Sequence, residues 1–90
     1  MFFLLICSGA FADPWQDADS LRNAGKCKES ADAFSELIQQ NPGDIRGYRG
    51  RGVAFWRMGD LDAAIADFDK AISLDPENAE VYNNRGLALK

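Results

Sequence analysis

The sequence is similar to itself at an offset of 34 residues. Aligned without a gap, residues 25–55 and 59–89 share eight identical positions. The identical pairs are Gly25 and Gly59, Phe34 and Phe68, Ile38 and Ile72, Pro42 and Pro76, Tyr48 and Tyr82, Arg51 and Arg85, Gly52 and Gly86, and Ala54 and Ala88. A fixed period of this length is typical of repeat arrays, in which each unit buries its apolar face against its neighbours. The period therefore favours a binding scaffold over a catalytic domain.

A turn separates two predicted amphipathic helices in the middle of the chain. Tyr48, Gly52 and Phe55 recur at three- and four-residue spacing, as one face of a helix requires. Asp60 is a suitable N-cap for the second helix, and Pro76 ends it. The apolar stripe of the second helix consists of Leu61, Ala64, Ile65, Phe68, Ala71 and Ile72. Because each helix carries such a stripe, the pair needs further helices to cover it.

These residues resemble the tetratricopeptide repeat. The resemblance is carried by Tyr48-x2-Arg51-Gly52-x2-Phe55, followed by Ala64-x3-Phe68, Ala71 and Pro76. It implies an all-α fold in which helix-turn-helix repeats stack as an α-solenoid, a fragment of a right-handed superhelix. The expected units are a degenerate first unit over residues 13–44, a well-formed unit over 45–78, and the first helix of a truncated unit over 79–90.

The two outer units depart from the family pattern. Ser30 and Leu37 replace alanines expected in the first unit, and the third unit lacks its second helix. Atypical ends are usual in repeat arrays. We therefore expect an N-terminal fragment of a longer protein, with an exposed helix face in the third unit through which the chain could self-associate.

The first twelve residues differ in kind from the rest. An apolar run over residues 2–7 is followed by Ala10-x-Ala12, and every charged side chain lies at or beyond Asp13. This pattern predicts a signal peptide over residues 1–12, cleavage after Ala12 and an exported, periplasmic or secreted protein. No Lys or Arg precedes the apolar run, so a buried N-terminal helix and a lipid anchor at Cys7 stay open as alternatives. Cleavage would leave Cys27 as the sole cysteine, either buried or reactive.

Composition argues against several classes of function. The net charge of −4 disfavours nucleic-acid binding, which we do not expect even though the chain has several arginines. The chain has no histidine, which removes the commonest general base and metal ligand. The apolar segment at the N-terminus is too short to span a bilayer. We therefore expect no enzyme activity, cofactor, metal or membrane span in this chain.

The resemblance also implies a concave groove lined by the first helix of each unit. The implied lining positions are Trp15, Asp19, Arg22 and Asn23 in the first unit, Arg46, Arg49, Val53, Trp56 and Arg57 in the second, and Glu80, Asn83, Leu87 and Lys90 in the third. Helical spacing independently places Arg46, Val53 and Trp56 on one face, together with Arg49. Tryptophan and arginine are enriched in interface hot spots, and arginine can clamp a carboxylate with two hydrogen bonds.

Two interpretations of that face stay open. In the first, Trp56 and the arginines bind a protein or peptide, preferably an acidic segment. In the second, Trp56 packs against the next unit and the arginines pair with surface aspartates. Gly47 and Gly50 weaken the helix and suggest close approach to something in the groove.

The leading functional hypothesis is a protein- or peptide-binding scaffold or adaptor in an exported complex. The alternative is an accessory interaction domain of a larger enzyme whose catalytic part lies beyond residue 90. Arg51 and its counterpart Arg85 lie outside the groove positions, and we expect each to pair with an aspartate or a backbone carbonyl.

Overall fold

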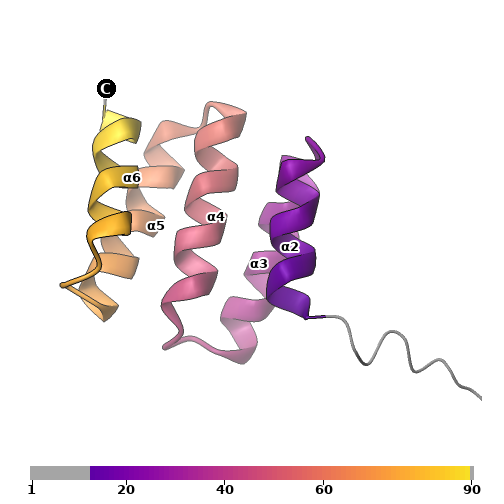
Figure 1. Ribbon diagram of the computed structural model, residues 1–90, viewed down its shortest axis with the longest axis horizontal. Coiled ribbons are helices and arrows are strands. Elements are labelled where there is room, and N and C mark those ends of the chain that lie inside the picture. Colours follow the sequence, from indigo (N-terminus) through magenta and orange to yellow (C-terminus); the bar gives the residue numbers. More distant parts are fainter. Residues whose placement is uncertain (1–12, 90) are drawn as a thin grey trace, which may run out of the picture.

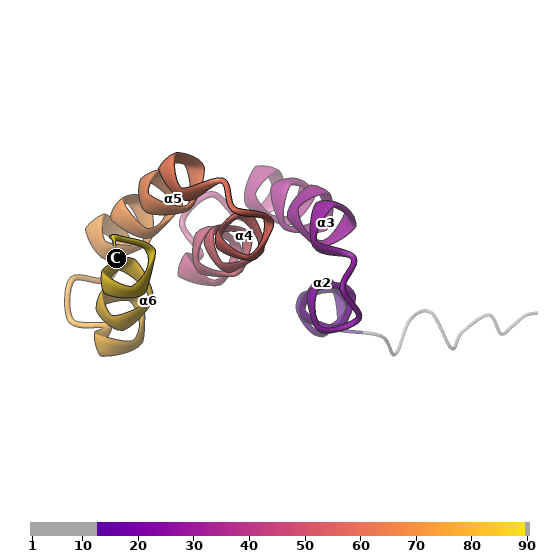
Figure 2. The ribbon, with the colours of Figure 1, turned by 90° about the horizontal axis from the view of Figure 1, so that it is seen from above.

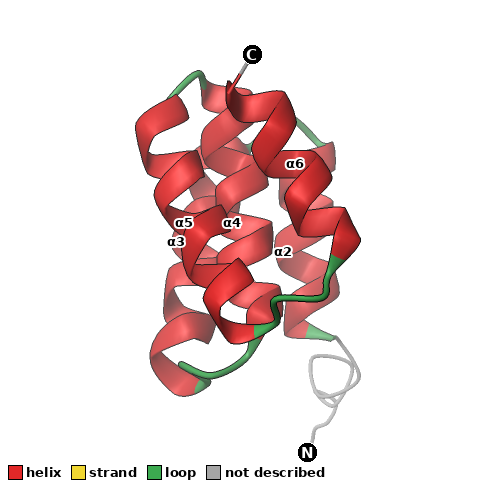
Figure 3. Cartoon of the chain, turned by 90° about the vertical axis from the view of Figure 1, so that its left-hand side faces the viewer, coloured by secondary structure: helices red, strands yellow, loops and turns green. Residues whose placement is uncertain are grey.

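The computed structural model describes residues 13–89, which form five α-helices and no strand (Figure 1, Figure 3). The helices are α2 (Pro14–Asn23), α3 (Cys27–Gln40), α4 (Ile45–Met58), α5 (Leu61–Leu74) and α6 (Ala79–Leu89). The all-α helical-repeat fold predicted from the sequence is thereby confirmed. The predicted signal peptide over residues 1–12 and the groove position Lys90 lie outside the described residues.

The helices form two layers of an arc. Figure 2 shows α2, α4 and α6 along the inner side and α3 and α5 along the outer side. Each helix packs mainly on the helix before it and the helix after it in the chain. The result is an elongated body with extents of 51, 26 and 19 Å. Its inner layer consists of the first helix of each unit, as the resemblance implied.

Local sequence signals set the helix ends. Asp13 caps α2 by accepting a hydrogen bond from the Trp15 amide at 2.9 Å, and Asp60 caps α5 through the Ala63 amide at 3.3 Å. Gly59 ends α4 with a φ of 85°, a left-handed conformation that glycine adopts without strain. The cap predicted at Asp60 is therefore confirmed, and Asp13 serves as a second one.

Two apolar clusters form the core. One joins α5 and α6 through Ala64, Phe68, Ala71 and Val81, with side chains of α4 packed against it. The other joins α2 and α3 through Ala18, Phe34 and Leu37.

Glycines in α4 let the neighbouring helices approach closely. A Cβ atom on Gly52 would lie 2.5 Å from Cε1 of Phe68, and one on Gly47 would lie 2.5 Å from Cγ1 of Ile38. A Cβ atom on Gly50 would overlap the ring of Phe34. The close approach suggested by Gly47 and Gly50 is thus to the side chains of Ile38 and Phe34 on α3.

The departures of the first unit from the repeat pattern have a structural role. Ser30 is fully buried and donates its hydroxyl to the Ala18 carbonyl at 2.7 Å. Leu37 is also buried and packs in the cluster with Ala18. The serine thus ties α3 to α2 where the pattern has an alanine, and the first unit forms a complete helix pair.

Arg51 connects three consecutive helices. Its Nε and Nη2 atoms each donate to a carboxylate oxygen of Asp67 on α5 at 2.8 Å, and its Nη1 atom donates to Ser35 Oγ on α3 at 3.0 Å. The hydrogen bonds with Asp67 raise the pKa of the Arg51 guanidinium above its ordinary value. In the next unit, Arg85 donates to Asp69 at 2.6 Å. The structural role predicted for Arg51 and Arg85 is confirmed.

Candidate functional site

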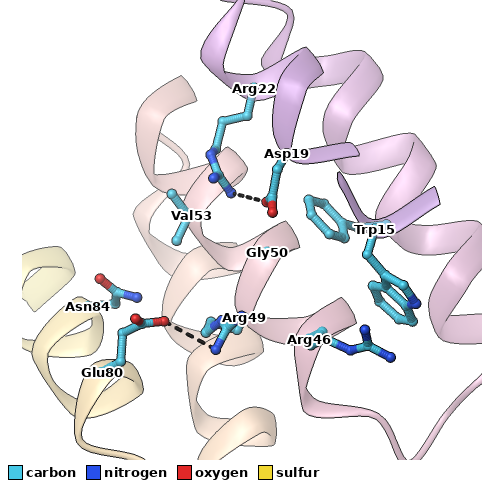
Figure 4. A pocket seen from close by; sticks show the side chains of 10 residues that line it. Trp15, Asp19, Arg22, Arg46, Arg49, Gly50, Val53, Glu80 and Asn84 are labelled. Carbon is cyan, nitrogen blue, oxygen red and sulfur yellow. Dashed lines mark ion pairs between the residues drawn. The ribbon is translucent and has the colours of Figure 1, made fainter. Parts of the chain in front are cut away.

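A cavity of about 390 Å³ opens on the inner layer, between α2, α4 and α6 (Figure 4). Side chains from all three units line it. The lining residues are Trp15, Asp19 and Arg22 from α2, Phe34 from α3, Arg46, Arg49, Gly50 and Val53 from α4, and Glu80 and Asn84 from α6. The structure therefore brings together at one surface most of the groove residues singled out in the sequence.

Five of the predicted groove positions do not line this cavity, namely Asn23, Trp56, Arg57, Asn83 and Leu87. Trp56 is half-buried and packs against the core cluster that contains Val81 of the next unit. Arg57 is exposed at the end of α4 and does not line the cavity. Asn83 lines a separate notch on α6. The surroundings of Trp56 thus agree with the second interpretation above, in which it packs against the next unit.

Phe34 and Asn84 line the cavity but were not predicted, whereas Gly50 had been singled out for close approach in the groove. Phe34 reaches the cavity from α3, beneath the glycine at position 50, and helical spacing within α4 gives no sign of it. Gly50 and Asn84 are one period apart, so they are the same repeat position in consecutive units. The sequence signal that could have found Asn84 is this equivalence, because Gly50 directly follows Arg49 of the predicted face.

Every arginine of the cavity already has an acidic partner. Arg22 Nη1 lies 3.0 Å from Asp19 on its own helix, and Arg49 Nη1 lies 3.1 Å from Glu80, which joins α4 to α6. Both pairs are visible in Figure 4. The arginines are thus held in defined orientations before any ligand arrives. These pairs also agree in part with the second interpretation, which paired the arginines with acidic side chains of the surface.

Arg46 is fixed from two sides. Its guanidinium donates to both carboxylate oxygens of Asp44, with Nη2 at 2.7 Å from Oδ2 and Nε at 3.1 Å from Oδ1. Its Cζ atom lies 4.2 Å from the ring centroid of Trp15, a cation–π contact between α4 and α2. The hydrogen bond from Arg46 lowers the pKa of Asp44. Trp15 and Arg46 therefore form one mixed aromatic and cationic edge of the cavity.

Arg22 keeps one donor without a partner. Its Nε atom is buried and has no hydrogen bond within the part of the chain that the structure describes. A buried donor without an acceptor is costly, because it has lost its hydrogen bonds to water.

The lining chemistry is suited to binding. Guanidinium groups lie beside the surfaces of Trp15, Phe34 and Val53, which combines charged hydrogen-bond donors with apolar contact area. Between residues 13 and 89, no group of three or more Cys, Asp or Glu side chains could hold a metal ion. None of the helices in that range is long and apolar enough to cross a membrane.

Comparisons with known proteins agree with the repeat architecture. Residues 57–90 match the family model described as TPR repeat. The chain is 34% identical over 61 residues to Hsp70-Hsp90 organizing protein 3 of Arabidopsis thaliana, which covers 68% of this chain and 11% of that protein. It is 37% identical over 60 residues to FK506-binding protein-like of Mus musculus, covering 67% of this chain and 17% of that protein.

A further relative is an enzyme by name. The chain is 32% identical over 85 residues to UDP-N-acetylglucosamine--peptide N-acetylglucosaminyltransferase of Giardia intestinalis, covering 90% of this chain and 6% of that protein. The chain thus spans only a small part of each relative. The region it shares with them is a helical repeat, a kind of scaffold that binds proteins. Together, the 34-residue period, the stacked helix pairs and these matches show that the chain belongs to the tetratricopeptide-repeat family.

Proposed function

We propose that the chain binds an extended, acidic segment of a partner protein in the cavity between α2, α4 and α6. The observation that carries this proposal is the convergence of side chains from all three units on one concave surface. Arg22, Arg46 and Arg49 would pair with carboxylates of the segment. Trp15 and Val53 would supply apolar contacts.

The grouping of arginines supports an acidic ligand. Three arginines line the cavity, and the carboxylates of Asp19, Asp44 and Glu80 balance their charge. The cavity thus gathers three guanidinium groups in a chain whose net charge is −4. The acidic surroundings would repel an acidic segment from most of the surface, so its binding would be confined to the cavity.

The internal ion pairs set the expected affinity. A carboxylate of the ligand that binds Arg49 must replace Glu80 or share the guanidinium with it. The exchange of one ion pair for another yields little net free energy of binding. The arginines therefore select an acidic ligand, while burial of the ligand's apolar side chains supplies most of the affinity. The affinity should also fall as salt is added, because the arginines of this open site are partly exposed.

Selection of peptides from a random library tests this proposal. Selection on the chain should enrich peptides rich in Asp and Glu. The Arg49→Glu variant should bind the selected peptides with an affinity lower by about tenfold or more. Arg57→Glu makes the same charge change on the same helix outside the cavity, so it is the matched control and should have a much smaller effect. Enrichment of neutral or basic peptides, or equal losses in the two variants, would refute the use of this cavity.

We also propose that the mature chain acts as an adaptor outside the cytoplasm. The apolar run over residues 2–7 and the Ala10-x-Ala12 site support export. N-terminal sequencing of the protein from its native cell should give Asp13 as the first residue. A protein that retains residues 1–12 and stays in the cytoplasm would contradict export.

A second candidate is an accessory module of a larger enzyme. It is favoured by the Giardia transferase, of which the chain spans only 6%. In that case the cavity would still bind a protein segment, and catalysis would belong to another part of the polypeptide. Sequencing the complete transcript distinguishes the two: a catalytic domain in the same reading frame supports the module, and further repeats alone support the adaptor.

A further inference from the structure

Two side-chain contacts that join consecutive inner helices use the same pair of repeat positions. Trp15 and Arg49 are one 34-residue period apart, and so are Arg46 and Glu80. Arg46 reaches from α4 to Trp15 on α2, and Glu80 reaches from α6 to Arg49 on α4 (Figure 4). The first contact is a cation–π contact, whereas the second is an ion pair. One repeat position therefore presents a cation to the cavity in the second unit and an anion in the third.

The carboxylate that pairs with Arg49 is held more loosely than the one that pairs with Arg46. Asp44 accepts hydrogen bonds from Nε and Nη2 of Arg46, and it also caps α4 through the Arg46 amide. The Asp44 side chain is 25% exposed, whereas that of Glu80 is 66% exposed. Glu80 lies in the first turn of α6 and reaches Arg49 across the cavity. A carboxylate this exposed regains its hydration when it leaves, so displacement of Glu80 costs little.

Arg22 is the least accessible arginine of the cavity. Its side chain is 16% exposed, which is less than that of Arg49. Its partner Asp19 lies three residues before it on α2, so the pair stays together when neighbouring helices move. A carboxylate from outside the chain therefore reaches Arg49 with less disruption than it reaches the other two arginines.

We infer that Glu80 is an internal competitor for the carboxylate of the ligand, and that Arg49 is the group for which they compete. In the free chain Glu80 occupies the Arg49 guanidinium. When an acidic segment binds, one of its carboxylates takes this place and Glu80 turns to solvent. This role rests on the proposed function, because it concerns the ligand of the same cavity. It makes Glu80 a residue that lowers the affinity of the site and so regulates it.

The opposite role would be that Glu80 orients Arg49 for the ligand. A positioning residue acts well when packing and further hydrogen bonds fix its own side chain. Glu80 does not meet this condition, because most of its side chain lies in solvent. The two roles predict opposite effects on affinity: removal of a competitor strengthens ligand binding, and removal of a positioning group weakens it.

The Glu80→Gln variant tests this inference, because glutamine keeps the size of the side chain and removes its charge. The probe is a labelled peptide built from Glu-Leu-Ser units, titrated with the full chain by fluorescence anisotropy at about 0.15 M salt. Glu80→Gln should raise the affinity for this peptide by about twofold to fivefold, the range that one exposed ion pair accounts for. The affinity for a peptide of Gln-Leu-Ser units should stay unchanged.

Two further variants show whether Glu80 acts through Arg49. Glu77→Gln makes the same charge change at an exposed position outside the cavity. It is the matched control and should have a much smaller effect, because salt screens a charge at a distance. In a chain that carries Arg49→Gln, the additional change Glu80→Gln should have no effect, because the group for which it competes is gone. Circular dichroism checks that each variant is folded.

Several results would overturn the inference. A lower affinity of Glu80→Gln would show a positioning role. An equal gain in Glu77→Gln, or a gain that persists beside Arg49→Gln, would show general charge repulsion instead. If Arg49→Glu weakens the acidic peptide but Glu80→Gln leaves its affinity unchanged, the competition is refuted and the proposed function stands. If the acidic peptide binds no better than the Gln-Leu-Ser peptide, both are refuted.

Discussion

Gly52 and Gly86 occupy the same repeat position, yet alanine at the two sites should change stability in opposite directions. Both residues lie inside helices, where replacing glycine with alanine gains up to about 1 kcal/mol from helix propensity alone. At Gly86 no atom lies within 4 Å of the new Cβ. Because Gly86 is in the last turn of α6, we expect about half of that gain, a stabilisation of about 0.5 kcal/mol.

At Gly52 the same methyl group meets the ring of Phe68. The new Cβ would lie 2.5 Å from Cε1 and 2.8 Å from Cδ1, whereas carbon atoms prefer about 3.5–4 Å. The ring must therefore shift by about 1 Å, but it is fully buried among Ala64, Ala71 and Val81. Overpacking of this kind costs about 1–3 kcal/mol. With the propensity gain subtracted, Gly52→Ala should destabilise by about 1 kcal/mol.

Thermal unfolding followed by circular dichroism at 222 nm (a wavelength that reports helix) measures this contrast. A difference of about 1.5 kcal/mol corresponds to roughly 6–12 °C in Tm for a domain of this size, with Gly86→Ala higher and Gly52→Ala lower than the unmodified chain. A shift of both variants in the same direction would refute the reasoning, because it would mean that the α4–α5 contact does not distinguish the two glycines.

Two further predictions concern ion pairs. Arg51→Ala leaves the buried carboxylate of Asp67 without its partner and should cost about 2–3 kcal/mol in urea unfolding, a value reduced from that of a fully buried pair because the Arg51 side chain is 24% exposed. Arg85→Ala, which breaks an exposed pair, should cost less than about 1 kcal/mol, and equal losses would contradict the difference in burial. The pKa of Asp44 is lowered from its ordinary value of 3.8, mainly by the hydrogen bond from Arg46, so its stabilising effect is complete above that value and is lost as the pH falls through the lower, folded-state pKa. An NMR titration should show a higher pKa for Asp44 in Arg46→Ala, and an unchanged pKa would argue against the contact.

The parts of the fold that were predictable depend on local sequence. Caps such as Asp13 and Asp60, the left-handed Gly59 and the apolar stripe of α5 each act within one or two turns of a helix. The repeat period then placed these helices in stacked pairs. The sequence therefore predicted the helices and the inner layer without information on distant contacts.

Which neighbour covers a given face depends on distant contacts, and there the sequence left two interpretations open. Trp56 and Val53 lie on one face of α4 and both pack against the α5–α6 core, but only the valine also lines the cavity. The side-chain size of Trp56 pointed to binding, and only the position of α6 shows that it packs inside. The neighbour of Gly50 was not predictable for a related reason, because Phe34 belongs to another helix.

The three-helix contact of Arg51 has a consequence for cooperativity. In a stack of repeats, each unit is stabilised by its own contacts and by the interface with its neighbour. Arg51 contributes both to the contacts within its unit and to the interface with the neighbouring unit, because one guanidinium binds Ser35 of the first unit and Asp67 of the second. When either unit opens, the other loses part of the contact. We therefore expect the two units to unfold together and their amides to share one level of protection against hydrogen exchange. The smallest segment that opens independently should then be the pair of units joined by Arg51.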